Sequence, residues 1–99
     1  MKHTGIPDCI FAGNDNMAKK ILRYLLSQGY DIPQDVALVG FDDMIFSSII
    51  KPALSTVKVY KYEMGDIAVD RLRQLLYDEN IHPVKISLHT TFMKRDSCR

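Results

Sequence analysis

Polar residues lie directly after two short apolar runs, at positions where a protein could bind a ligand. Asn14 and Asp15 follow the run Cys9–Ala12, and Asp42 follows the run Val36–Phe41. An amide side chain both donates and accepts hydrogen bonds, and a carboxylate accepts from two neighbouring donors, so these types suit a polar small molecule. A structural explanation stays open, because asparagine and aspartate are also common helix caps and strand terminators.

The segment between the two runs predicts a helix, which makes the whole stretch a strand–helix–strand unit. The helix spans Met17–Gln28, follows three cap-type residues at positions 14–16, and ends before Gly29. Its apolar residues recur at helical spacing, at Met17, Ala18, Ile21, Leu22, Leu25 and Leu26. Parallel strands joined in this way bring their carboxyl ends to one edge of the sheet, where open α/β sheets bind ligands. We therefore expect the polar residues after both strands at a shared edge.

The rest of the chain adds four expected elements. Met44–Ile50 is too short for a normal helix and predicts one or two helical turns or a 3₁₀ piece. Ser55–Val59 is rich in β-branched residues and predicts a third parallel strand. Tyr62–Tyr77 predicts a second amphipathic helix, and the alternating segment Val84–Met93 a further strand at a sheet edge. The fold class is α/β, with a parallel sheet.

Composition and charge exclude several classes of protein. The 99 residues are 46% hydrophobic and carry a net charge of +1, too little to bind nucleic acid through charge alone. The apolar runs are too short to span a membrane, and no signal peptide opens the sequence. Cys9 and Cys98 have neither metal-site spacing nor a disulfide pattern. We expect a reduced, cytoplasmic protein with no membrane partner.

The residues do not support an enzyme. Asp42 and Asp43 are adjacent on a strand end and point to opposite sides, which is unsuitable for paired acid–base catalysis. No serine or cysteine lies in a nucleophile motif, and no glycine-rich phosphate loop occurs, so we expect no cofactor. His82 and His89 lack partners for catalysis, and we expect no metal site.

Four motifs and a short closing segment resemble the C-terminal portion of LacI/GalR-family transcriptional regulators. In chain order they read IFAGNDNMA, IPQDVALVGFDD, PALSTVKV and YEMGDIAVDRLRQLL, closing with KRDSC. The resemblance spans residues 8–98, and the four motifs in the family's order are together highly specific. It implies a Rossmann-like parallel-sheet lobe of a type I periplasmic-binding-protein-like fold. The second motif favours the regulators over the periplasmic sugar-binding relatives.

The resemblance also implies that the fold is incomplete. A whole family member carries a helix-turn-helix DNA-binding domain, a hinge helix, an N-terminal lobe and the first part of the C-terminal lobe. We expect a single partial domain, with the strand–helix–strand core at 1–57, a crossing strand and helix at 58–80, and a returning strand and tail at 81–99. The helix at 58–80 would pack on the missing lobe. A designed truncation, a proteolytic piece and a short open reading frame are all compatible with the sequence.

Effector contacts follow from the resemblance residue by residue. Asn14 corresponds to a contact with an effector hydroxyl, usually of a sugar, and Asp42 to the family's acidic effector contact. Asp15 is expected either as a cap or rim residue or as an effector contact, and Phe46 either to border the cleft or to pack on the core. Many relatives have a glutamine at the position of Val59. Because the valine side chain cannot hydrogen-bond, the effector here is less polar on that side or is contacted from elsewhere.

The function implied is effector sensing and dimerisation within a DNA-binding regulator. The expected partners are a small-molecule effector of sugar type and a second copy of the chain, in a homodimer or higher oligomer, with DNA bound only through a domain outside this chain. The segments 17–28 and 45–50 correspond to a dimer interface. With the second lobe absent, the apolar stripe of helix 62–77 would either fold back on its own sheet or dock on another copy, and we expect docking. The alternatives are a dimerisation or scaffold fragment that binds no ligand and a part of a periplasmic-type sugar-binding protein.

Overall fold

The computed structural model describes residues 5–78 and 80–99 and divides into two compact units. The elements, in chain order, are β1 (Cys9–Phe11), α1 (Asp15–Ser27), β2 (Ala37–Asp42), the 3₁₀ helix η1 (Ile45–Ser48), β3 (Ser55–Lys58), α2 (Lys61–Tyr77) and β4 (Thr91–Met93). The sheet unit comprises the described residues up to Val59 together with Thr91–Arg99, and the helix unit comprises Tyr60–Thr90. Each unit is described by itself.

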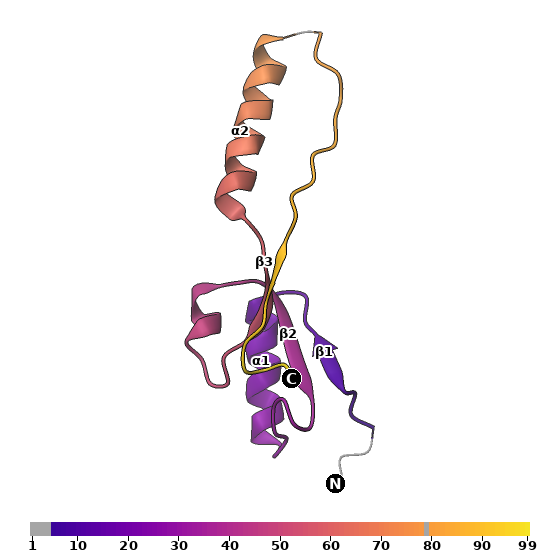
Figure 1. Ribbon diagram of the computed structural model, residues 1–99, viewed down its shortest axis with the longest axis vertical. Helices are drawn as coiled ribbons and strands as arrows, with labels where there is room; N and C mark the ends of the chain where they lie inside the picture. Colours follow the sequence, from indigo (N-terminus) through magenta and orange to yellow (C-terminus); the bar gives the residue numbers. More distant parts are fainter. Residues whose placement is uncertain (1–4, 79) are drawn as a thin grey trace. The chain divides into compact units, whose positions relative to one another are not determined.

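The sheet unit holds a four-stranded sheet in the order β1-β2-β3-β4 (Figure 1). β1 pairs with β2 and β2 with β3 in parallel, whereas β4 pairs with β3 antiparallel. The parallel pairing of the first three strands confirms the topology expected from the strand–helix–strand pattern. The 3₁₀ helix at Ile45–Ser48 confirms the short helical turn expected between the second and third strands.

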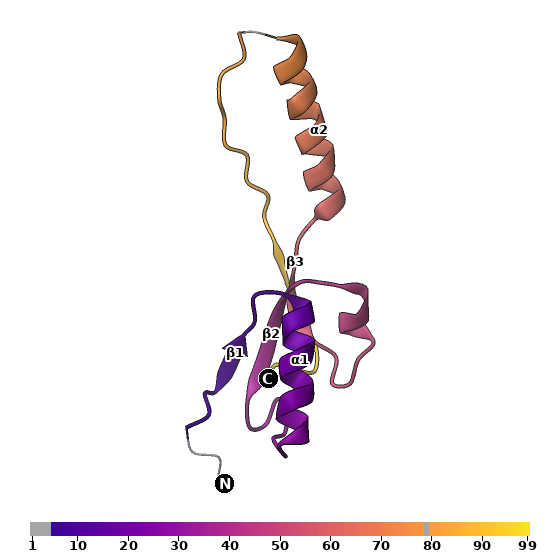
Figure 2. The same ribbon diagram turned by 180° about the vertical axis from the view of Figure 1, so that it is seen from behind.

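Helix α1 lies against the sheet and provides one side of the core (Figure 2). The buried cluster consists of Ala12, Ala18, Leu22, Leu25, Ile32, Val36, Leu38 and Leu54. The first four residues of β2 are all buried. The continuous apolar run at Cys9–Ala12 is typical of a strand covered on both faces, but that expectation is wrong for β1. Cys9 and Phe11 are exposed, because β1 is an edge strand of the sheet. Of the expected apolar stripe of α1, Met17 and Leu26 are exposed, and the other members turn toward the core.

The beginning of α1 differs by two residues from the expectation. The helix starts at Asp15 because Asn14 is the cap: its side-chain oxygen accepts from the Met17 amide at 2.8 Å. Gly29, at a φ of +86°, follows the last turn as expected for a helix end.

The expected strand at Val84–Met93 is mostly wrong, because only Thr91–Met93 is a strand. The pairing partner sets this limit. Thr91 lies opposite Lys58, the last residue of β3, and from Lys61 the chain enters α2 and offers no strand for residues before Thr91 to pair with. Alternating hydrophobicity in this segment instead reflects contact with α2, since Val84, Ile86 and Leu88 line a hollow with that helix.

The second expected helix is confirmed as α2, which buries none of its residues. Its exposed apolar side chains include Met64, Leu72, Leu75 and Leu76. None of the helices described in residues 5–78 and 80–99 is long and apolar enough to cross a membrane.

Candidate functional site

The carboxyl edge of the parallel sheet gathers the expected ligand residues. Asn14 lies three residues after the end of β1, and Asp42 is the last residue of β2, paired with Lys58 at the end of β3. Because the three strands run parallel, these positions share one edge, and Val59 follows β3 at the same edge. The sequence-based placement of Asn14 and Asp42 on a common rim is consistent with this topology.

Asn14 combines a capping role with an unused donor. Its Oδ1 accepts from the Met17 amide, and its side chain is exposed to solvent. Among the residues that the structure describes, no acceptor is recorded for the Asn14 Nδ2 group. Capping and ligand binding therefore do not compete here, since they use different atoms of one amide.

Asp42 stands in an unusual backbone conformation. Its φ is 111° and that of Asp43 is 54°, in the region that side-chain-bearing residues rarely adopt. No hydrogen bond or ion pair of the half-buried Asp42 carboxylate is recorded within the described ranges 5–78 and 80–99. Residues held in such conformations cluster at functional sites, which makes this turn the strongest ligand-site candidate in the chain.

Asp15 has a different role from its neighbour, because its side chain is fully buried. Its Oδ2 accepts from the Met44 amide at 2.8 Å and from the Ser47 hydroxyl at 2.5 Å, and its Oδ1 accepts from the Thr56 hydroxyl at 2.7 Å. Of the two roles expected for Asp15, this arrangement favours the rim-stabilising one. With no exposed surface, its carboxylate serves the protein rather than a ligand.

Asp43 is held by the C-terminal tail. Its Oδ1 pairs with the Arg95 guanidinium at 2.8 Å, and its amide donates to the Thr56 hydroxyl at 3.2 Å. Thr56, Ser47 and Arg95 also belong to the site, although their sequence context did not predict it. Their partners are 13 to 52 positions away in the chain, and the only local signal was that Arg95 belongs to the closing KRDSC motif.

Phe46 lies in η1, half-buried, and contacts a cation rather than the central core. The Lys19 ammonium is 4.5 Å from the centroid of its ring, within the range of a cation–π interaction. Phe46 does not belong to the buried cluster. Its place in η1, three residues after Asp43, keeps it close in sequence to the carboxyl edge.

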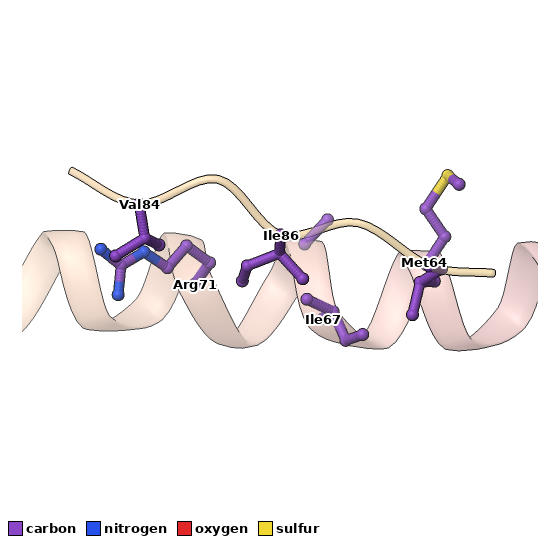
Figure 3. A pocket seen from close by; sticks show the side chains of 7 residues that line it. Met64, Ile67, Arg71, Val84 and Ile86 are labelled. Carbon is purple, nitrogen blue, oxygen red and sulfur yellow. The ribbon is translucent and has the colours of Figure 1, made fainter.

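A separate hollow of about 280 Å³ lies within the helix unit (Figure 3). It is lined by Met64, Ile67, Ala68, Arg71, Val84, Ile86 and Leu88. Its one charged group is engaged internally, because the Arg71 guanidinium donates to Gln74 and to the His82 carbonyl. This hollow is an apolar surface and offers little for a hydroxyl-rich ligand. In the described part of the chain, no three histidine, cysteine or acidic residues gather as a metal site.

Comparisons with known proteins agree on one family. A family model described as periplasmic binding protein-like domain matches residues 1–98. The probable HTH-type transcriptional repressor ExuR of Bacillus subtilis is 36% identical over 93 residues, which are 94% of this chain and 28% of that protein. The ribose operon repressor of Escherichia coli K12 is 31% identical over 97 residues, 98% of this chain and 29% of that protein. The chain thus spans somewhat more than a quarter of the length of these relatives.

Solved structures show the same relationship. A putative LacI transcriptional regulator from Bacillus cereus subsp. cytotoxis superimposes with a TM-score of 0.92 at 29% identity, covering 98% of this chain and 34% of that one. A CelR–cellobiose complex gives 0.86 at 33% identity, covering 91% and 28%. The lac repressor dimer bound to operator and the anti-inducer ONPF gives 0.86 at 30% identity, covering 94% and 32%.

These findings confirm the expected fold and the expected resemblance. The named relatives are transcriptional repressors and regulators, not enzymes. The match covers nearly the whole chain, and the structural neighbours share its fold. The chain belongs to the periplasmic binding protein-like family, and it is similar over nearly its whole length to part of LacI/GalR-type transcriptional regulators.

Proposed function

We propose that this chain is the effector-sensing and self-associating part of a LacI/GalR-type regulator, in which Asp42 and Asn14 bind hydroxyl groups of a sugar-type effector. The observation that carries the proposal is the Asp42 turn. The Asp42 carboxylate has no partner among the residues that the structure describes, and it stands at the carboxyl edge of three parallel strands, on a backbone at a φ of 111°. The unused Asn14 amino group at the same edge supplies a matching donor.

A sugar is the ligand class that fits this pair of groups. A carboxylate accepts from two adjacent hydroxyls, and an amide donates to the oxygen of a third. One relative is named for the ribose operon, and one structural neighbour is a cellobiose complex. Val59 offers no hydrogen bond at this edge, so the rest of the recognition comes from other residues. A cytoplasmic location, as in a regulator that acts on DNA, completes the proposal.

Variants of Asn14 separate its two roles. Asn14→Asp keeps a capping oxygen but removes the donor, whereas Asn14→Ala removes both. We expect Asn14→Ala to cost about 1 kcal/mol of unfolding free energy and Asn14→Asp close to none. Both variants should weaken the sugar response about tenfold, which corresponds to one lost hydrogen bond.

The measurement uses a regulator that joins this chain to the rest of its own lobe, a second lobe and a DNA-binding domain. Operator release is followed by fluorescence anisotropy with D-ribose, D-galactose and cellobiose as probes, and stability by urea unfolding. A full response in Asn14→Asp would show that Asn14 is a cap only. Failure of pentoses, hexoses and disaccharides alike to change operator binding would contradict sugar sensing itself.

Self-association is the second part of the proposal and rests on exposed apolar surface. Helix α2 buries no residue, and Met64, Leu72, Leu75 and Leu76 are all exposed. Beside the sheet, Ile45 and Ile49 of the η1 region are 85% and 67% exposed. Burial of apolar surface contributes about 25 cal/mol per Å², and large contiguous apolar patches rarely stay open on a soluble monomer. The similar lac repressor bound to operator is a dimer, which supports the same proposal.

We expect the purified chain to be a dimer or larger at tens of micromolar, measured by light scattering. The paired change Leu72→Glu and Leu76→Glu places charge on the α2 stripe and should yield a monomer. The change Ile45→Glu and Ile49→Glu tests the η1 surface separately, and it should weaken association less, because fewer apolar side chains are exposed there than on α2. A wild-type monomer at this concentration would contradict the proposal.

A further inference from the structure

Asp42 and Asp43 need outside support to keep their backbone conformation. At φ values of 111° and 54°, neither residue has the freedom of glycine, so neighbouring groups must hold this turn in place. Two independent sets of contacts surround it, one from a buried carboxylate and one from the C-terminal tail.

The buried carboxylate is Asp15, which holds the two amides that follow Asp42. Its Oδ2 accepts directly from the Met44 amide at 2.8 Å. Its Oδ1 accepts from the Thr56 hydroxyl at 2.7 Å, and that hydroxyl accepts in turn from the Asp43 amide at 3.2 Å. One side chain therefore fixes the exit from the turn, once directly and once through a single hydroxyl.

The tail contributes Arg95, which holds the Asp43 side chain. Its Nη2 donates to Asp43 Oδ1 at 2.8 Å, while its Nη1 donates to the Leu54 carbonyl at 2.9 Å. The Arg95 amide also donates to the Ser55 hydroxyl at 2.7 Å. The guanidinium thus links the Asp43 side chain to the segment that leads into β3, which restricts movement of the turn.

Asp15 also adjoins the second proposed ligand residue. It is the first residue of α1, directly after the Asn14 cap, where the helix dipole favours a negative charge. The Ser47 hydroxyl binds the same Asp15 oxygen as the Met44 amide, so η1 is tied to the start of α1. Every contact of this carboxylate therefore converges on the edge that carries Asn14 and Asp42.

We infer that Asp15 and Arg95 are positioning residues, which set the left-handed turn at Asp42–Asp43 and thereby aim Asp42 at the effector. The inference rests on the proposed function only for the identity of Asp42 as the effector contact. Thr56 is the link through which Asp15 acts on Asp43, because its hydroxyl contacts both.

The test removes the Thr56 hydroxyl while keeping the shape of that side chain. In the isotopically labelled chain, Thr56→Val loses the hydroxyl, Thr56→Ser keeps it, and Arg95→Met breaks the contact from the tail. Three-bond coupling constants report φ at Asp42 and Asp43, and hydrogen exchange of the Asp43 amide is compared with that of the buried Leu38 amide. Leu22→Ala is the control, since it weakens the core without touching the turn.

We expect changed coupling constants in Thr56→Val and in Arg95→Met, and Asp43 exchange about tenfold faster relative to Leu38 in Thr56→Val, as for one lost hydrogen bond. Thr56→Ser should match the wild type, and Leu22→Ala should lower stability without altering φ at the turn. Unchanged coupling constants in both Thr56→Val and Arg95→Met would overturn the inference, and if one variant fails to fold, the other decides. No sugar enters this measurement, so it stands apart from any failure of the proposed effector binding.

Discussion

Replacement of Asp42 is expected to abolish the effector response of a regulator that carries this chain, while operator binding stays intact. The Asp42 carboxylate has no partner among the described residues, so both of its oxygens can accept hydrogen bonds from a bound sugar. Hydrogen bonds to a charged group contribute about 1.5–3 kcal/mol each, so losing two of them should weaken effector binding by at least about 100-fold. The measurement is operator release as a function of sugar concentration.

The backbone at Asp42 decides which variants are informative. Alanine at a φ of 111° is strained, so Asp42→Ala mixes the loss of the carboxylate with a change of the turn. Asp42→Gly removes the same carboxylate and accepts this φ without strain. Asp42→Asn keeps the shape and one accepting oxygen, and should lose less than glycine. If Asp42→Gly responds to the effector like the wild type, Asp42 is not the effector contact.

The first half of the fold could be predicted from sequence because its signals are local. An apolar run, three cap-type residues, a helical stripe and Gly29 together specify β1, α1 and β2, and parallel pairing follows from the length of the connection. The helix α2 follows from its stripe in the same way. The prediction that Asn14 and Asp42 lie on one edge of the sheet follows from this topology alone.

What could not be predicted depends on contacts between distant parts of the chain. The start of β4 at Thr91 is set by where β3 ends, and alternation in sequence carries no information about that limit. Aspartate is a residue type that commonly caps helices, yet the partners of Asp15 are Met44, Ser47 and Thr56, which are 29 to 41 positions away. A single sequence therefore shows a polar edge but not which acid faces a ligand and which is buried.

Gly40 is the position where a single methyl group should do most damage to the fold. An ideal Cβ there would lie 2.2 Å from Asp15 Oδ1 and 3.1 Å from Leu54 Cδ2, inside the core and without room to move. Gly40→Ala must displace the buried carboxylate, so the three hydrogen bonds it accepts are strained or lost. We expect a loss of about 3–5 kcal/mol in the free energy of unfolding, from overpacking and unsatisfied buried groups together.

Two other glycines and one double variant identify the cause of that loss in urea unfolding. Gly13 and Gly65 have nothing within 4 Å of an added Cβ, so alanine should be tolerated at Gly13 and should stabilise α2 by about 1 kcal/mol at Gly65. If the clash is with Asp15, Gly40→Ala costs much less in an Asp15→Ala background, because the atom it strikes is gone and the two changes are not additive. Equal costs in both backgrounds would show that the carboxylate is not what makes a glycine necessary at position 40.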